Sequence, residues 1–174
     1  MSEDKSKIES LEQSPQTSNE NIECADFTLR PFNEKDEESA VRILNNNKVR
    51  EKLGKNLPNP YTAESFKIFL DKVKNDKETT YFAIEKDGGL IGSISIDLED
   101  NATAMFGYWL DEKYWGMGII TKAIEEIIKY GTKRFSIKKY YADTIDNNIG
   151  SQKVLIKNGF TLDKDSGSFV KIIE

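Results

Sequence analysis

One stretch decides how this chain folds: Gly107-Tyr-Trp-Leu-Asp-Glu-Lys-Tyr-Trp-Gly-Met-Gly-Ile-Ile-Thr-Lys-Ala-Ile-Glu-Glu-Ile-Ile-Lys-Tyr130. Its first four residues end an aromatic and apolar run, which is typical of a buried strand. After Gly118, charged residues occupy one side of a helical repeat, and apolar residues recur on the other side at Ile120, Ala123, Ile124, Ile127 and Ile128. The stretch therefore predicts a strand, a short loop and an amphipathic helix in succession.

Two glycines, Gly116 and Gly118, lie where the predicted strand gives way to the helix. The first turn of a helix has free backbone N–H groups and a partial positive charge. Because glycine has no Cβ atom, an anion can approach its backbone closely. The spacing is therefore compatible with a pyrophosphate cradle, and also with the simpler alternative, a glycine-containing turn that binds nothing. No Lys-Ser/Thr pair follows Gly118 and the full Gly-x-Gly-x-x-Gly pattern is absent, which disfavours nucleoside triphosphates and dinucleotides.

The same stretch resembles the acetyl-coenzyme A loop of the GNAT superfamily of N-acetyltransferases. The superfamily pattern is Arg/Gln-x-x-Gly-x-Gly/Ala, and its three defined positions are occupied here by Trp115, Gly118 and Ile120. Tryptophan at the first position is usual in the ribosomal-protein N-terminal acetyltransferase (RimJ/RimL-like) branch. Isoleucine at the third position departs from the small residue that the pattern expects.

Two further segments resemble the same branch. The segment from Asn148-Ile-Gly-Ser151 to Gly159-Phe160 is similar to its Asn-x-x-Ser...Lys-x-Gly-Phe motif, and the opening Phe27-Thr-Leu-Arg-Pro-Phe32 is similar to its first strand. The matches occur in the family's order and extend over residues 27–164. The resemblance implies an acetyl-coenzyme A-dependent transfer of an acetyl group to a primary amine, by direct attack. The acceptor stays open between a protein N-terminal α-amine and a small amine such as a polyamine or an amino sugar.

The resemblance also implies which residues bind the coenzyme. The backbone around the second glycine would hold the pyrophosphate, the end of the preceding strand would donate an N–H to the acetyl carbonyl, and an asparagine would contact the pantetheine arm. The implied coenzyme-binding set is Leu110, Gly116, Met117, Gly118, Ile119, Ile120, Thr121 and Asn148.

Ser151 is the predicted catalytic residue. It shares a helical face with Val154 and Leu155, which must face the sheet, so its hydroxyl is predicted to point inward. In the resembled branch such a serine contacts the coenzyme sulfur, where it would protonate the leaving thiolate. Many GNAT enzymes carry a tyrosine where Leu155 stands, so that route is unavailable here. The alternative is that Asn148 and Ser151 only cap the helix.

The general base is not identified by the sequence. Related enzymes often have a glutamate two residues before Gly-Tyr-Trp, and Met105 occupies that position. Asp97, Tyr108, Tyr141 or a chain of waters could substitute, although packing is the simpler role for Tyr108. This leaves a second function class open, a non-catalytic coenzyme-binding module. A third, an interaction domain without a ligand, has the least support.

Charge is distributed unevenly along the chain, which has 25 basic and 30 acidic residues. Residues 1–26 contain seven acids and two bases and account for the whole net charge of −5, so residues 27–174 are neutral. A neutral domain does not indicate nucleic-acid binding. Residues 1–26 are polar and poor in aromatic residues, which predicts a disordered acidic tail before a single domain over 27–174. The chain has no apolar run of membrane-spanning length and no secretory pattern, so we expect no membrane partner and a cytoplasmic location.

Histidine is absent and Cys24 is the single cysteine, so neither a histidine-based triad nor an internal disulfide is available, and no metal site is predicted. The pattern of apolar residues predicts the α+β class. We expect a mixed, mostly antiparallel sheet of about seven strands with about four helices, and no oligomeric state is predicted. The strands over 102–110 and 138–145 are predicted to be parallel, because a helix connects them.

Overall fold

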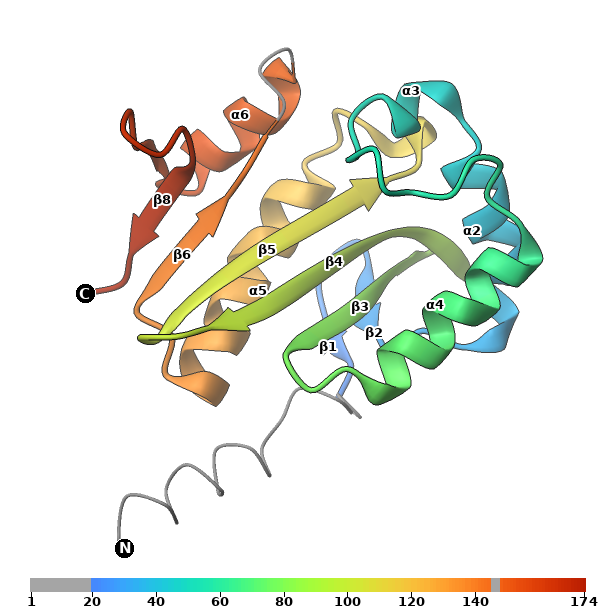
Figure 1. Cartoon of the computed structure of the whole chain (residues 1–174), viewed down its shortest axis with the longest axis horizontal. Helices are drawn as coiled ribbons and strands as arrows, with labels where there is room; N and C mark the ends of the chain where they lie inside the picture. The colour runs from blue at the N-terminus through green and yellow to red at the C-terminus, as the bar shows by residue number, and fades with distance from the viewer. Residues whose placement is uncertain (1–19, 145–147) are drawn as a thin grey trace, which may run out of the picture.

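The computed structural model describes residues 20–144 and 148–174 (Figure 1). None of the described helices is long and apolar enough to cross a membrane. The elements are β1 (Ile22–Glu23), β2 (Thr28–Arg30), the 3-10 turn η1 (Glu34–Asp36), α2 (Glu37–Leu44), α3 (Asn47–Arg50), α4 (Ala63–Asn75), β3 (Thr79–Lys86), β4 (Gly89–Glu99), β5 (Thr103–Leu110), the 3-10 turn η2 (Glu112–Tyr114), α5 (Ile119–Phe135), β6 (Lys139–Ala142), α6 (Ile149–Lys157), β7 (Thr161–Leu162) and β8 (Phe169–Ile172).

One sheet organises these elements, with the strand order β1-β2-β3-β4-β5-β6-β8-β7. Helix α5 packs against one face, whereas α2, α3 and α4 lie against the other (Figure 1). Only the β5–β6 pair is parallel among the described strands, as predicted from the connecting helix. The predicted α+β class and mostly antiparallel sheet are confirmed. The structure has one strand and one helix more than expected, namely β1 and α3.

Strand β1 lies within residues 1–26, which the sequence predicts to be a disordered tail. Ile22 pairs with Leu29, and the partly buried Ile22 and Cys24 pack against the main core. The ordered sheet therefore begins before Phe27. A strand of two residues is too short to show an alternating pattern, which explains why the sequence did not predict it. Residues 1–19 of the predicted tail lie outside the described residues.

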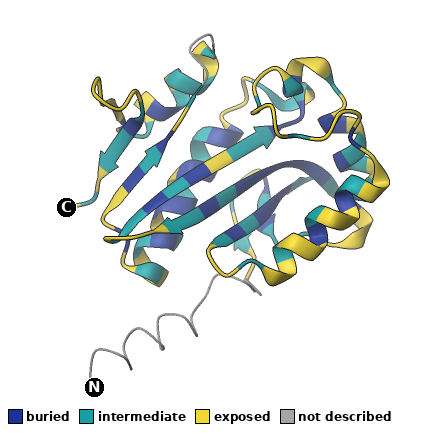
Figure 2. Ribbon diagram, in the orientation of Figure 1, coloured by how far each residue is buried: buried dark blue, intermediate teal, exposed yellow. Residues whose placement is uncertain are grey.

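The seam between α5 and the sheet is tightly packed, and Figure 2 shows the buried face of α5 turned toward the strands. A Cβ atom on Gly131 would come within 2.5 Å of the Tyr140 hydroxyl oxygen and of Ile96 Cδ1, so any larger residue would have to displace these side chains. Tyr140 is fully buried, and its hydroxyl donates to the Ile128 carbonyl oxygen at 3.0 Å and lies 3.0 Å from Thr132 Oγ1. These contacts hold β6 against α5.

Beyond that seam β5 and β6 separate. Strand β5 pairs with β4 along its whole length, from Thr103 opposite Glu99 to Leu110 opposite Gly92. Its pairing with β6 covers only residues 103–105. The second half of β5 therefore has one edge that faces away from β4 and is not paired to β6, and the pocket described below opens at this edge.

Candidate active site

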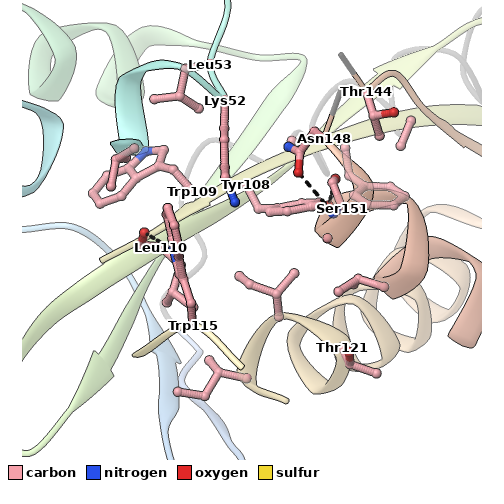
Figure 3. A pocket seen from close by; sticks show the side chains of 18 of the residues that line it. Lys52, Leu53, Tyr108, Trp109, Leu110, Trp115, Thr121, Thr144, Asn148 and Ser151 are labelled. Atoms are coloured by element: carbon pink, nitrogen blue, oxygen red, sulfur yellow. Dashed lines mark hydrogen bonds between the residues drawn. The ribbon is translucent and has the colours of Figure 1, made fainter. Parts of the chain in front are cut away.

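A pocket of about 620 Å³ opens where β5 and β6 diverge (Figure 3). Its walls come from the second half of β5, the loop into α5, the first turn of α5, the start of α6 and the segment after α3. The lining residues are Val49, Lys52, Leu53, Gly54, Phe106, Gly107, Tyr108, Trp109, Leu110, Tyr114, Trp115, Gly116, Gly118, Ile119, Ile120, Thr121, Ala142, Asp143, Thr144, Asn148, Gly150, Ser151, Val154 and Lys157.

The N-terminus of α5 forms one end of this pocket. Gly116 and Gly118 both have left-handed backbone conformations, with φ of 79° and 78°, and Gly118 is the N-cap of α5. No atom lies within 4 Å of a Cβ built on either glycine, so the space beside them is open. The N–H groups of the first helical turn have no partner within the helix. This end of the pocket thus combines open space, free donors and the positive end of a helix dipole, which is what an anionic group requires.

The loop between β5 and α5 is fixed by side chains from both ends. The Trp115 indole Nε1 donates to the Leu110 carbonyl oxygen at 2.9 Å (Figure 3). Asp111 is buried; it accepts from the Lys113 N–H at 3.3 Å and forms an ion pair with Arg42 at 3.1 Å. The glycines are therefore held in place before any ligand binds.

The end of β5 offers a backbone donor to the pocket. The Asp111 N–H donates to the Ile91 carbonyl oxygen at 2.7 Å, which continues the ladder with β4. Successive backbone groups of a strand point to opposite edges, so the N–H of Leu110 points away from β4 toward the open edge. Leu110 also lines the pocket. This arrangement corresponds to the donor that the resemblance implies for the acetyl carbonyl.

Ser151 lies on the inward side of α6, in hydrogen-bond contact with the hydroxyl of Tyr108 (Figure 3). Asn148 caps α6 because its Oδ1 accepts from the Ser151 N–H at 3.1 Å. Capping uses the amide oxygen of Asn148 and leaves its Nδ2 group available as a donor. The capping role and the pocket-lining position therefore coexist in the same residue.

The tyrosine hydroxyl beside Ser151 stays protonated at neutral pH. Burial raises the pKa of Tyr108, and the hydrogen bond with Ser151 offsets part of that rise. Tyr108 therefore acts as a hydrogen-bond partner rather than as a phenolate base. Sequence reasoning weighed Tyr108 mainly as a packing residue and did not connect it to Ser151.

The other base candidates lie away from the pocket. Met105 pairs with Asp97 on β4 and with Tyr141 on β6, so the three residues lie side by side in the paired part of the sheet. None of the three lines the pocket. Asp97 accepts a hydrogen bond from Thr79 at 2.9 Å, and burial together with nearby Glu99 raises the pKa of Tyr141 to about 12.

Most of the coenzyme-binding residues implied by the resemblance line the pocket, with one exception. Met117 does not line it, and its side chain is 60% exposed. Ile120, which departs from the family pattern, is largely buried in the core, so its bulk is accommodated there. The Thr121 carbonyl oxygen accepts from Asn158 Nδ2 at 3.2 Å, which ties α6 to the first turn of α5.

Two lysines of the pocket were missed by sequence reasoning. The Lys52 ammonium lies 3.8 Å from the centroid of the Trp115 ring, a cation–π contact at the wall of the pocket (Figure 3). Lys157, at the end of α6, lines the pocket from the other side. Lys52 belongs to no motif, and Lys157 is the lysine of the Lys-x-Gly-Phe segment, to which sequence reasoning gave no role in the pocket.

Cys24 lies outside this pocket. It packs against the main core, and burial, followed by the charge of Glu126, raises the pKa of its thiol to about 11. A thiol with that pKa is almost entirely protonated at neutral pH. Such a thiol is a poor nucleophile.

Known proteins share this architecture. A ribosomal-protein-serine acetyltransferase of Escherichia coli K12 is 36% identical over 84 residues, which cover 47% of each chain. The structure of Mycobacterium smegmatis RimJ with a coenzyme A disulfide matches with a TM-score of 0.72 at 19% identity, covering 83% of this chain and 79% of that one. The ribosomal-protein-S5-alanine acetyltransferase of Vibrio fischeri matches with a TM-score of 0.73 at 21% identity, covering 89% and 97%.

These likenesses differ in what they establish. The first curated relatives are matched over 42% to 60% of their own length, and the two solved structures share the fold at low identity. The family model described as the acetyltransferase (GNAT) domain, in contrast, matches residues 26–161, which is most of the chain and includes β5, α5 and α6. The chain therefore belongs to the GNAT acetyltransferase family.

Proposed function

We propose that this protein is an N-acetyltransferase that moves the acetyl group of acetyl-coenzyme A to a primary amine by direct attack. The acceptor is a protein N-terminal α-amine or a small amine. The observation that carries this proposal is the pocket between β5 and β6, which joins the N-terminus of α5 to the Tyr108–Ser151 hydroxyl pair. Relatives named as ribosomal-protein acetyltransferases, and a related structure that contains a coenzyme A disulfide, support the same activity class.

The residues at the α5 end fit the phosphates of the coenzyme. Open space beside Gly116 and Gly118, the free N–H groups from Ile119 to Thr121 and the helix dipole together favour an anion. Met117 would contribute through its backbone, since its exposed side chain does not line the pocket. Lys52 and Lys157 supply positive charge on the walls. Asn148 would offer its Nδ2 donor to an amide-containing arm.

The residues at the other end fit the chemistry of a thioester, which supplies an activated acetyl group when bound. The Leu110 N–H at the open edge of β5 would stabilise negative charge on the carbonyl oxygen. Ser151 would give a proton to the leaving sulfur. Tyr108 would act as a positioning residue, because its hydroxyl holds that of Ser151. Direct attack is favoured because Cys24, the single cysteine, is a partly buried neutral thiol outside the pocket.

A second candidate function is a coenzyme-binding module without turnover. Met105 favours it, because related enzymes often carry glutamate at that position. Among the described residues, Asp143 is the single carboxylate that lines the pocket, and it already accepts a hydrogen bond from the Ser168 hydroxyl. If the protein does turn over, the amine would have to lose its proton to water.

Release of free thiol from acetyl-coenzyme A distinguishes the two. The full chain is incubated with acetyl-coenzyme A and a panel of peptides with free N-termini, polyamines and amino sugars. Thiol release that depends on an amine supports the enzyme. A coenzyme-dependent rise in melting temperature with no thiol release from any acceptor would support the binding module. No rise at millimolar coenzyme would refute both.

A further inference from the structure

The Lys52 amine reaches the part of the pocket where β5 ends. Its ammonium nitrogen lies 3.8 Å from the centroid of the Trp115 ring, and the Trp115 indole Nε1 donates to the Leu110 carbonyl oxygen at 2.9 Å (Figure 3). Leu110 carries the backbone N–H proposed above for the acetyl carbonyl. Trp115 therefore links the Lys52 amine to the strand end where the thioester would be held.

The segment that carries Lys52 is fixed by the guanidinium of Arg50. This group donates to the carbonyl oxygens of Leu44 at 2.8 Å, Leu57 at 3.3 Å and Pro58 at 2.8 Å, which precede and follow the segment in the sequence. Lys52 is thus presented to the pocket from a backbone that is already ordered. An amine held in this way gives up less freedom when it reacts than a free amine does.

The contact made by the Lys52 ammonium differs from that of Lys48, which lies four positions earlier. Lys48 forms an ion pair with Glu112 at 3.1 Å and does not line the pocket. The partner of Lys52 is the face of an aromatic ring, which attracts an ammonium through its positive charge. This attraction lapses when the amine becomes neutral, and the nitrogen lone pair is then free. Lys52 is also exposed, so its proton can pass to water without a protein base.

We propose that Lys52 is acetylated by its own chain, a proposal that rests on the function proposed above. The neutral Lys52 nitrogen attacks the acetyl carbon of bound acetyl-coenzyme A, so that an N–C bond forms and the C–S bond breaks. The nitrogen loses a second proton to water as the amide forms. Ser151 gives the sulfur a proton and regains one from solvent. The products are an acetamide on Lys52 and free coenzyme A.

Two properties distinguish this reaction from chemical acetylation of exposed lysines in solution. The amine and the coenzyme site belong to one chain, so the rate per chain does not depend on the protein concentration. The reaction also requires bound coenzyme, so it selects Lys52 over lysines outside the pocket.

Mass spectrometry of the full chain, incubated with acetyl-coenzyme A and no added amine, tests both properties. We expect Lys52 to be acetylated at least about tenfold faster than Lys48. The rate per chain should stay unchanged when the protein is diluted about tenfold. G118E should lose the selectivity for Lys52, because the proposed phosphate site is blocked, while slow chemical acetylation of exposed lysines continues.

A matched pair of variants identifies the acceptor nitrogen. K52R keeps the positive charge at the pocket wall, but its guanidinium is always protonated and offers no nucleophilic amine. K48R makes the same change outside the pocket. K52R should lose the rapid mass increase of one acetyl group, and K48R should retain it. A coenzyme-dependent rise in Tm in both variants shows that coenzyme binding is kept.

The possible failures are distinguishable. Acetylation of Lys52 no faster than that of Lys48, or a rate per chain that falls on dilution, would overturn the inference. Thiol release with an added amine would then leave the acetyltransferase standing. If neither acetylated Lys52 nor thiol release with any amine were found, despite a coenzyme-dependent rise in Tm, the proposed function itself would be refuted.

Discussion

The two edges of β5 differ in how far they are paired. On one edge, eight residues of β5 pair with residues of β4, whereas on the other edge three residues of β5 pair with residues of β6. Where both edges are paired, β5 belongs to the core, and Tyr140 closes the seam with α5. Where only the β4 edge is paired, the strand becomes the wall of the pocket and Leu110 turns an N–H toward it. One strand thus contributes to the core at its start and lines the pocket at its end.

Removing the Tyr140 side chain should have the largest effect on the closed seam. Tyr140→Ala deletes a fully buried ring and two hydrogen-bond contacts, so the free energy of unfolding should fall by about 3–5 kcal/mol. Tyr141→Ala, one position along and partly exposed on the opposite face, should cost about 1 kcal/mol. Urea denaturation measures both. Equal decreases in the free energy of unfolding for the two variants would mean that Tyr140 contributes no more to stability than Tyr141 does.

A charge at the glycine end of the pocket should abolish coenzyme binding. Gly118→Glu introduces bulk and negative charge beside the first turn of α5, where the coenzyme phosphates are proposed to bind. A ligand at 100 times its Kd stabilises a protein by about 2.7 kcal/mol, and this gain should be lost. Differential scanning fluorimetry with and without acetyl-coenzyme A measures it.

Gly167→Glu is the matched control for that change. Gly167 has φ of 77° and open space around it, as Gly118 does, but it lies outside the pocket. Both variants should lose about 1–2 kcal/mol of stability from the left-handed backbone. The control should retain the coenzyme-dependent rise in Tm. If both variants lose that rise, the effect is conformational and the phosphate site is not at Gly118.

Ser151→Ala tests the reacting end of the pocket. A positioned proton donor contributes about 10²-fold or more, so kcat should fall by that factor while the coenzyme-dependent rise in Tm is kept. Lys153→Ala, on the exposed face of α6, controls for helix stability and should leave kcat unchanged. Turnover that is indifferent to Ser151→Ala would assign Ser151 to capping alone.

Tyr108→Phe should have the smallest effect. Loss of one hydrogen bond to Ser151 costs about 1 kcal/mol of positioning, or about fivefold in kcat, with KM for acetyl-coenzyme A nearly unchanged. Because burial raises the pKa of Tyr108 above its ordinary 10, no loss of activity below pH 10 should come from its ionisation. The raised pKa also means that the contribution of protonated Tyr108 to the free energy of unfolding is complete below pH 10. This contribution is lost as the pH rises through the raised pKa.

The pH–rate profiles of the wild type and Tyr108→Phe check this. Their alkaline limbs should coincide up to about pH 10, the ordinary tyrosine pKa. If the rate of the wild type changed with pH near pH 8 and the rate of the variant did not, Tyr108 would be shown to titrate during turnover, as a base would.

The sequence by itself determined the parts of the fold that depend on local periodicity and local backbone chemistry. The apolar repeat after Gly118 specified α5, and the two glycines marked its N-terminus, because only glycine adopts φ near +78° without strain. The inward side of α6 followed from the spacing of Ser151, Val154 and Leu155. The parallel pairing of β5 and β6 followed from the connecting helix.

Only the tertiary structure decided how these parts meet. Tyr108 and Ser151 are 43 positions apart in the sequence. They come together because β5 continues beyond the residues that pair with β6, and α6 lies beside the unpaired edge of β5. Lys52 reaches the same pocket from the segment after α3, and no motif includes it. The length of strand pairing depends on long-range packing, such as that of Tyr140 against Gly131, and local sequence patterns do not encode it.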